Sequence, residues 1–295
     1  MENLHKCQFD FIKVKSQKVN RESVNWEMLN EHPTIKNAYT LDAKSGLHGK
    51  NFKLYFTKGD YVVLETSIPY LVYGHNYVQV SGHDLVATFL RLKELLRIDF
   101  INAHVLQFEY GGFMTKGIEA KDYIKNIIDV SSYDLKFSSP FMKMYGNSST
   151  NFKIYDAVAN ARKKKTFTRG NYPNGKLIKF EVKVLNAQRS FQREILVIDL
   201  CRPEIFEPII TGLNFHISMI TELRALIDFK TNTNSLNDIL FNCLKHLQNQ
   251  FGYPIYELVI GLINDLDLSP SQKSKRRKSF IALEEKFKLT QANSN

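Results

Sequence analysis

The sequence predicts an α+β protein, with a mainly antiparallel sheet built from two strand-helix-strand halves, flanked by helices and followed by a helical C-terminal region. Three observations predict this fold class. Strand-like segments rich in β-branched and aromatic residues dominate the first two thirds of the chain. Amphipathic helical segments interrupt them, and helical periodicity alone fills the last third.

The first half begins with strands and ends with a helix. Ser81 is expected to cap an amphipathic helix, because apolar residues recur at helical spacing from Leu85 to Leu96. Lys58-Gly59-Asp60 has the composition of a hairpin turn. Strand patterns cover residues 9–14, 53–57, 61–65, 68–72 and 77–80.

The second half returns to strands after a short helix. Residues 104–110 read as a strand that ends at Gly111-Gly112, and residues 119–128 as the helix. Further strands are expected at residues 135–137, 152–156 and 177–185, with a basic connector over residues 162–175. We find no internal repeat at a fixed period.

The character of the chain changes after Arg193. Helical periodicity covers residues 203–228, 235–250 and 254–267, with prolines near two of the starts. The joint is expected at residues 232–235. The predicted organisation is therefore one domain over residues 1–230 and a helical subdomain with a basic tail over residues 231–295.

The charge balance favours a polyanionic partner. Forty Lys and Arg against 30 Asp and Glu give a net charge of +10. No apolar run approaches the roughly 20 residues of a membrane-spanning helix, so nucleic acid is expected and a membrane is not. The chain has no phosphate-binding Gly-rich loop, dinucleotide fingerprint, paired cysteines or zinc-protease motif, which leaves nucleotide hydrolysis, dinucleotide redox chemistry and structural zinc without support.

Residues 145–156 carry a candidate nucleophile. Tyr145 adjoins a turn rich in Gly, Asn and Ser, which could project the side chain and offer donors to a phosphate. Tyr155 sits inside an apolar strand beside Asp156. A phenol needs a base or a metal ion to attack a phosphodiester, and with 14 tyrosines in the chain a structural role is the default for each.

Two strand carboxylates could supply that help. Glu109 and Glu181 each follow an apolar pair, a polar residue and an aromatic residue, and alternation places Lys179 on the same face as Glu181. Carboxylates on neighbouring strands suit Mg²⁺ or Mn²⁺. The structural alternative is that both point to solvent and pair with lysines.

Basic residues follow the second tyrosine. Charge and aromatic residues are mixed in this stretch, as in proteins that track phosphates and stack bases, although a solvated loop is the alternative. A second basic run, residues 273–278, is either another phosphate-binding patch or a solvated tail. The candidate DNA-binding residues are Arg162, Lys163, Lys164, Lys165, Arg169 and Lys179.

These motifs together resemble the replication initiators of filamentous phages and rolling-circle plasmids. In that family a glycine-serine turn leads to a Tyr-Asp-Lys segment and then to a Leu-Arg-x-Glu strand, to which Tyr155-Asp156 and residues 178–181 are similar. The likeness covers about residues 65–225. Gln107 and Lys179 stand where the family usually has arginine, and Ala157 and Asn160 replace its Lys and Glu.

The resemblance implies an enzyme that nicks and rejoins origin DNA through a 5′-phosphotyrosine. Tyr145 is the favoured nucleophile and Tyr155 the second choice, while Glu109, Glu181 and Asp156 would hold Mg²⁺ or Mn²⁺. Single-stranded or cruciform origin DNA, a host helicase and polymerase, and a second copy of the chain are the implied partners, in the cytoplasm of a bacterial host. The alternatives are a non-catalytic origin-binding or copy-control protein, and an RNA-binding protein.

Overall fold

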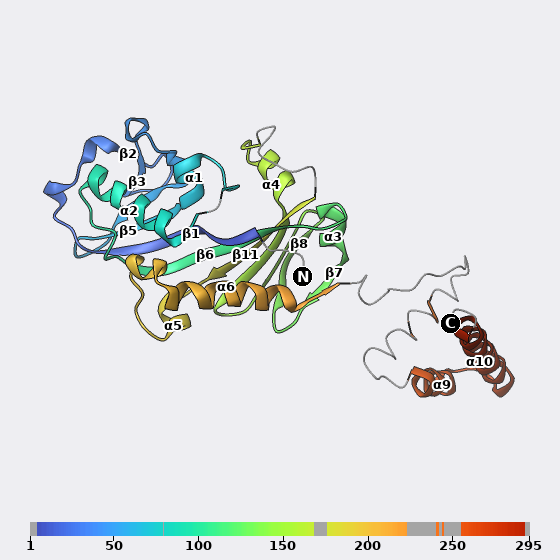
Figure 1. The fold of residues 1–295 in the computed structure, drawn as a ribbon. Coiled ribbons are helices and arrows are strands. Elements are labelled where there is room, and N and C mark those ends of the chain that lie inside the picture. The colour runs from blue at the N-terminus through green and yellow to red at the C-terminus, as the bar shows by residue number, and fades with distance from the viewer. Residues whose placement is uncertain are drawn as a thin grey trace. The chain divides into compact units, whose positions relative to one another are not determined.

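Ten strands in the part of the chain that the structure describes form one antiparallel sheet, so the predicted α+β class is confirmed (Figure 1). The structure is a computed structural model that describes residues 5–78, 80–167, 176–222, 240–241, 244 and 255–292. The chain forms two units, residues 1–221 and 222–295. The expected joint at residues 232–235 and most of the expected helix at 235–250 lie outside the described residues.

The order of the strands divides the sheet into two equivalent halves. From the centre outward the first half runs β1, β5, β4, β3, β2, and the second runs β6, β11, β10, β9, β8. Each half therefore starts on a central strand, crosses to the outer edge and returns strand by strand. The strands are β1 (His5–Lys18), β2 (Leu29–Glu31), β3 (Ala38–Leu41), β4 (Lys53–Phe56), β5 (Tyr61–Ser67), β6 (His104–Thr115), β8 (Asp134–Ser139), β9 (Met142–Gly146), β10 (Thr150–Asp156) and β11 (Leu177–Val184).

Helices cover the sheet, with α6 beneath it and α4 above it in the view of Figure 1. The helices of the first unit are α1 (Ile68–Tyr73), α2 (Gly82–Leu96), α3 (Ala120–Asn126), α4 (Ala157–Lys163), α5 (Ala187–Phe191) and α6 (Pro203–Ser218). Short strands β7 (Ile127–Val130) and β12 (Ile220–Glu222) pair separately. Single 3-10 turns lie at Arg21–Ser23, Trp26–Met28, Ala43–Ser45, Gly49–Asn51 and Val197–Cys201.

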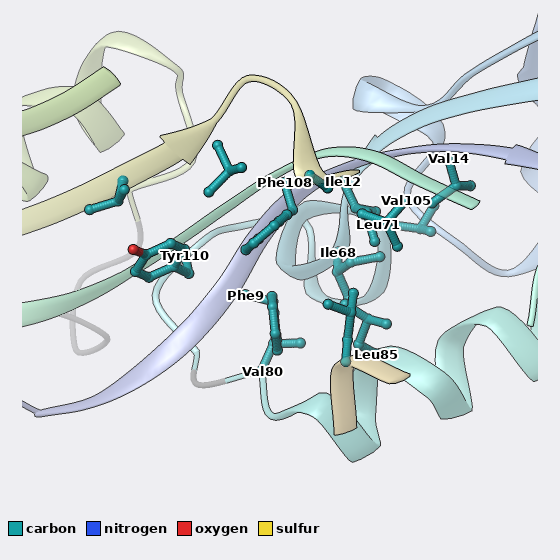
Figure 2. Packing of buried hydrophobic residues seen from close by; sticks show 14 of the residues in the cluster. Phe9, Ile12, Val14, Ile68, Leu71, Val80, Leu85, Val105, Phe108 and Tyr110 are labelled. Carbon is teal, nitrogen blue, oxygen red and sulfur yellow. The ribbon is translucent and has the colours of Figure 1, made fainter. Parts of the chain in front are cut away.

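The hydrophobic core lies between one face of the sheet and α2, α3 and α6. Phe9 of β1 contacts Phe108 of β6 and Phe206 of α6, with ring centroids 6.2 and 5.8 Å apart. Figure 2 shows this packing, in which β1, β6, α1 and α2 each contribute side chains. Because side chains alternate along a strand, burying Phe152 and Phe180 in this core turns Lys153 and Glu181 to the opposite face.

Several sequence predictions for the first unit were wrong in their boundaries or type. No strand is present at the described residues of 77–80, and the helix expected at 203–228 ends at Ser218, before strand β12. Residues 68–72 form helix α1, because Pro69 occupies its first turn and Gly74 ends it in the left-handed region at φ 75°. β6 continues through Gly111 to Thr115, and a Cβ at Gly111 would lie 2.1 Å from the Phe180 carbonyl oxygen. The glycine therefore lets β11 approach closely rather than ending the strand.

The predicted helix after Ser81 is confirmed. The Ser81 side chain accepts from the Asp84 amide, and the Asp84 carboxylate accepts in return from the Ser81 amide. This reciprocal cap satisfies donors that the first helical turn would otherwise leave unused.

The second unit contains helices α9 (Ile255–Asp265) and α10 (Pro270–Ala292). Phe241, Ile263 and Phe280 form its core in the described residues, with Phe241 and Phe280 ring centroids 5.6 Å apart. The basic run at residues 273–278 lies in α10. Among the described helices of both units, none has the length and apolar character needed to cross a membrane.

Candidate functional site

The sheet face opposite the core carries a buried cluster of charged side chains at its centre. The Tyr155 hydroxyl donates to Glu181 Oε1 at 2.7 Å, and Lys179 Nζ lies 2.7 Å from the same oxygen. Lys179 also donates to Asp10 Oδ2 at 2.5 Å. One ammonium group therefore lies between two carboxylates, with a phenol bonded to one of them.

Strand register brings these residues together. Tyr155 on β10 pairs directly with Lys179 on β11, and Lys153 pairs with Glu181. Directly opposed residues of antiparallel strands share a face, so the four side chains must project the same way. Asp10 reaches the cluster from β1, where the pairing with β6 shifts register between Phe9 and Ile12.

Glu109 lies at the side of the cluster and is held by lysines. Its Oε1 accepts from Lys153 Nζ at 3.0 Å and lies 3.4 Å from Lys183 Nζ. Lys153 Nζ is also 3.9 Å from Glu181 Oε2, so it bridges the two glutamates. The structure thus brings Glu109, Glu181 and Tyr155 together, as the candidate site required.

Neutral polar side chains complete the surroundings of Asp10. Ser67 Oγ donates to Asp10 Oδ1 at 2.6 Å, and Asn76 Nδ2 lies 3.4 Å from both Asp10 Oδ2 and the Tyr155 hydroxyl. Asn76 Oδ1 is buried and makes no hydrogen bond. Native structures rarely bury such an acceptor without a partner, and Asn76 is one of the residues that line the cavity over the cluster.

A cavity of about 290 Å³ opens over the cluster. Its walls come from both halves of the sheet, from α1 and from the residue after α4. The size suits a phosphate group with part of a sugar or base, and the lining is polar rather than apolar. The lining residues are Asp10, Phe11, Asn51, Lys53, Glu65, Ser67, Tyr70, Asn76, Glu109, Lys153, Tyr155, Lys164 and Glu181.

Burial and close charges separate the proton affinities in the cluster. Burial raises the pKa of Glu181 above its ordinary value although Lys179 opposes the shift. Burial acts the same way on Asp10, but there the charge of Lys179 and several hydrogen bonds prevail and lower the pKa. Burial, together with the negative charges of Glu181 and Asp10, raises the pKa of Tyr155 well above its ordinary value. Glu181 is therefore the carboxyl group best suited to exchange a proton with Tyr155.

Lys179 is charged despite complete burial. Burial lowers its pKa, but the charges of Asp10 and Glu181 outweigh that effect and raise it. For Lys153, too, burial lowers the pKa, but the charges of Glu181 and Glu109 outweigh that effect and raise it. Buried ion pairs cost desolvation energy and contribute little net stability. A buried charged cluster that lines a cavity is therefore a candidate functional site.

The structure does not bring Tyr145 to this site. Tyr145 pairs with Phe152 and so projects to the core face, where it is 1% exposed. Its hydroxyl is buried and makes no hydrogen bond. The turn that follows it is closed on itself, because the Asn147 side chain accepts from the amides of Ser149 and Thr150.

Asp156 also lies away from the cluster. Its side chain accepts from the Ala159 amide at 2.9 Å and caps α4. A capping carboxylate next in sequence to Tyr155 projects to the other face of β10, so the structure gives Asp156 a local structural role.

The basic residues expected to bind DNA do not lie together in one patch. Arg162 and Lys163 end α4, and the Arg162 guanidinium lies 5.0 Å from the Phe167 ring centroid. Lys164 lines the cavity and lies 4.9 Å from the Tyr70 ring centroid, while Lys165 is exposed at φ 57°. Arg169 lies outside the described residues. Lys179, also expected to bind DNA, is instead the buried centre of the cluster.

Sequence reasoning missed Asp10, Lys153 and Asn76. A signal for Asp10 was present, because Gln8-Phe9-Asp10-Phe11 closely matches Gln107-Phe108-Glu109-Tyr110. Aligning the two segments would have pointed to Asp10 as the counterpart of Glu109. Asn76 belongs to residues 65–225, which carry the resemblance to the initiators, and residues 69–76 are similar to a family segment that contains an asparagine. Its place beside Tyr155 depends on tertiary packing.

The oxygen-rich cluster does not have the arrangement of a divalent metal site. Asp10 and Glu181 are hard ligands of the kind that Mg²⁺ prefers, but the Lys179 ammonium lies between them. Within the described ranges, no three side chains of His, Cys, Asp or Glu are grouped so as to hold a metal ion. The residues as placed fit an ammonium group rather than a divalent metal ion.

The fold and the cluster together define an α+β protein with a tyrosine, carboxylate and lysine site on the face of a two-halved antiparallel sheet. A scan against models of known protein families finds no match for the chain. A search among curated proteins likewise finds no significant relative.

Proposed function

We propose that the first unit nicks and rejoins DNA through a covalent link to Tyr155. The observation that carries the proposal is the hydrogen bond from the Tyr155 hydroxyl to Glu181 Oε1, at 2.7 Å, beside the buried Lys179 ammonium. A tyrosine paired with a carboxylate of raised pKa, in a polar cavity, has the parts of an activated nucleophile.

The step itself needs no co-reactant. Tyr155 Oη attacks a backbone phosphorus and its proton passes to Glu181, while the bond from phosphorus to the 3′ oxygen breaks. The leaving oxygen takes up a proton from water and becomes a 3′ hydroxyl, Glu181 returns its proton to the solvent, and the 5′ phosphate stays on the tyrosine. The reverse reaction restores the strand, because the phosphotyrosine keeps the energy of the original phosphodiester.

Lysines supply the positive charge that the transition state requires. Lys153 lines the cavity, is fixed by its ion pair with Glu109 and would neutralise charge as it develops on the phosphate oxygens. Lys53 and Lys164 line the same cavity and would hold the entering strand. The net charge of +10 supports a nucleic-acid partner for the whole chain.

The wider role proposed is initiation of rolling-circle replication. A nick leaves a 3′ hydroxyl, which a polymerase can extend while a helicase opens the duplex. This part of the proposal rests on the resemblance of residues 65–225 to the phage and plasmid initiators, and on the recovery of Tyr155, Glu109 and Glu181 in one cluster.

A second candidate function is DNA binding without catalysis. It is favoured by one observation, that Asp10, Glu109 and Glu181 are each already paired with a lysine. Tyr155 is also only 5% exposed, so a scissile phosphate must enter the cavity to reach it.

Covalent capture separates the two candidates without knowledge of the origin sequence. The full chain is incubated with single-stranded oligonucleotides that have a randomised centre, with Mg²⁺, with Mn²⁺ and with a chelator. Covalent adducts are separated under denaturing conditions, digested to a nucleotide stub and located by peptide mass spectrometry. We expect a stub on Tyr155, lost in Tyr155→Phe.

Tyr145→Phe is the matched control, because it removes a hydroxyl that makes no hydrogen bond on the other face of the sheet. It should leave the adduct unchanged. Retention of oligonucleotides without any adduct would support the binding-only candidate. An adduct that survives Tyr155→Phe and disappears in Tyr145→Phe would overturn the assignment of the nucleophile. Loss of the adduct with chelator would restore the divalent ion to the proposal.

A further inference from the structure

A second cavity, of about 560 Å³, opens where β1 ends and β5 and β6 begin. It is about twice as large as the cavity over Tyr155, and the proposed function assigns nothing to it. Its lining combines two lysines, a histidine, a tyrosine and four amide side chains with a single carboxylate. A hollow of this size with a polar and positively charged lining can hold a nucleobase together with its sugar.

Strand pairing places this cavity beside the one over Tyr155. Lys13 pairs with Gln107 across β1 and β6, and Lys13 Nζ lies 2.7 Å from Glu65 Oε1. Lys13 lines the larger cavity and Glu65 the smaller one, so this ion pair lies between the two. Along β6, Gln107 and Glu109 lie on one face and about 7 Å apart. A single strand that follows this basic groove can therefore place neighbouring nucleotides in both cavities.

Lys15 and Tyr61 present a positive charge and an aromatic ring side by side. Lys15 Nζ lies 4.2 Å from the centroid of the Tyr61 ring, which is partly exposed. Among the described residues Lys15 forms no ion pair, whereas Lys13 is paired with Glu65. An ammonium group without a carboxylate partner can bind a phosphate, and a ring beside it can stack a base.

Amide side chains line another part of the cavity. Gln107 projects beside Lys13 on the sheet face opposite the core, because the two residues pair directly. Gln17 Nε2 lies 3.2 Å from His104 Nε2, and His104 Nδ1 lies 3.3 Å from Glu194 Oε2, so contacts hold the Gln17 amide in place. An amide offers both a donor and an acceptor to the edge of a base. These groups therefore suit recognition of a base rather than general attraction to phosphate.

We propose that this cavity is a base-reading site, which receives a nucleotide of the single DNA strand whose backbone enters the cavity over Tyr155. The base stacks on Tyr61 beside Lys15, which holds an adjoining phosphate. Gln17 and Gln107 bond the edge of the base. The inference rests on the proposed nicking and joining function, because the site selects which phosphodiester is presented to the nucleophile.

Retention of DNA strands followed by sequencing tests the site without requiring cleavage. The full chain is incubated with single-stranded oligonucleotides that have a randomised centre, and the bound strands are separated and sequenced. We expect one position with a preferred base, favoured by about 5–150-fold over the others. Gln107→Leu removes the hydrogen-bonding groups of the side chain, so it should abolish this preference and leave other positions unchanged.

Two pairs of variants separate stacking from charge. Tyr61→Leu should weaken binding by about 5–150-fold, while Tyr61→Phe keeps the ring and should bind as tightly as the unchanged protein. Lys15→Gln should weaken the binding of every sequence and reduce the slope of log affinity against log salt by about 0.7. Lys36→Gln, an exposed lysine outside the cavity, should leave the slope unchanged.

Thermal unfolding of each variant verifies that it folds, and nucleotide stubs on Tyr155 are mapped in parallel. A base preference that survives Gln107→Leu would overturn this inference, and a stub on Tyr155 in the same experiment would leave the proposed function standing. A preference lost in Gln107→Leu without any stub would support the base-reading site and overturn nicking. Failure to retain any strand would overturn both.

Discussion

Two clusters on the open sheet face, one in each half of the sheet, use the same strand pairing in different surroundings. Glu65 on β5 and Glu181 on β11 each pair with a lysine of the next strand outward. Tyr155 bonds to Glu181 beside a lysine with 0% side-chain exposure, and Tyr55 bonds to Glu65 beside a lysine that is 27% exposed. Lys179 has Val63 as its counterpart on β5, so the first half has no ammonium group at this position. Strand register therefore sets which side chains meet, whereas burial sets how strongly their charges interact.

Removing the buried lysine should have the largest effect. Lys179→Met leaves Asp10 buried without a counter-charge and leaves Glu181 only the Lys153 ammonium at 3.9 Å, so we expect a loss of about 3–5 kcal/mol in the free energy of unfolding. Lys13→Met removes the partly exposed counterpart and should cost no more than about 1 kcal/mol. Urea unfolding at neutral pH measures both. Equal losses would show that burial does not distinguish the clusters.

Neutralising the glutamates tests which of them acts as a base. Glu181→Gln keeps the shape of the side chain and removes the proton acceptor, so adduct formation at Tyr155 should slow by about 10²–10⁴-fold. Glu65→Gln should leave labelling of Tyr155 unchanged, because Glu65 accepts from Tyr55 instead. The rates are followed by quantifying the Tyr155 stub over time. A Glu181→Gln variant as fast as the unchanged protein would remove Glu181 from the mechanism.

Lowering the pH should weaken the contribution of Asp10 to the free energy of unfolding. Its pKa is lower in the folded protein than the ordinary 3.8, so the stability it contributes is present above 3.8 and is lost as pH falls below that value toward the folded pKa. Between pH 6 and pH 3, the difference in unfolding free energy between the unchanged protein and Asp10→Asn should shrink by about 1 kcal/mol. A difference that is constant over this range would contradict the ion pair with Lys179.

Tyr145→Phe should have the smallest effect on stability. The buried Tyr145 hydroxyl makes no hydrogen bond, so removing it should change the unfolding free energy by less than about 0.5 kcal/mol or raise it slightly. Tyr155→Phe removes a hydrogen bond to a carboxylate and should cost about 1.5–3 kcal/mol. Differential scanning calorimetry of the two variants compares the core face of β9 with the open face of β10. A large loss in Tyr145→Phe would place a partner at that hydroxyl.

Local pattern was enough for much of the fold and for part of the site. The capped helix after Ser81 and the strands with Glu109 and Glu181 follow from periodicity, which depends on neighbours in sequence. Tyr145 was expected to be the nucleophile, but it lies outside the cluster. The turn motif beside it does not determine which face of the sheet a strand residue occupies. Pairing with Phe152 decides that face, and this pairing depends on burying the aromatic side chain.

The fold class, the basic charge, and the alternation that keeps Lys179 and Glu181 on one face follow from the sequence, because each depends on composition or on spacing along one strand. The meeting of Asp10 and Asn76 with Tyr155 depends on tertiary packing, since they lie on separate segments that meet across the sheet. Tertiary packing also decided that Lys179 is buried and charged between two carboxylates, because burial and the distances between charges depend on the packing of all the surrounding elements.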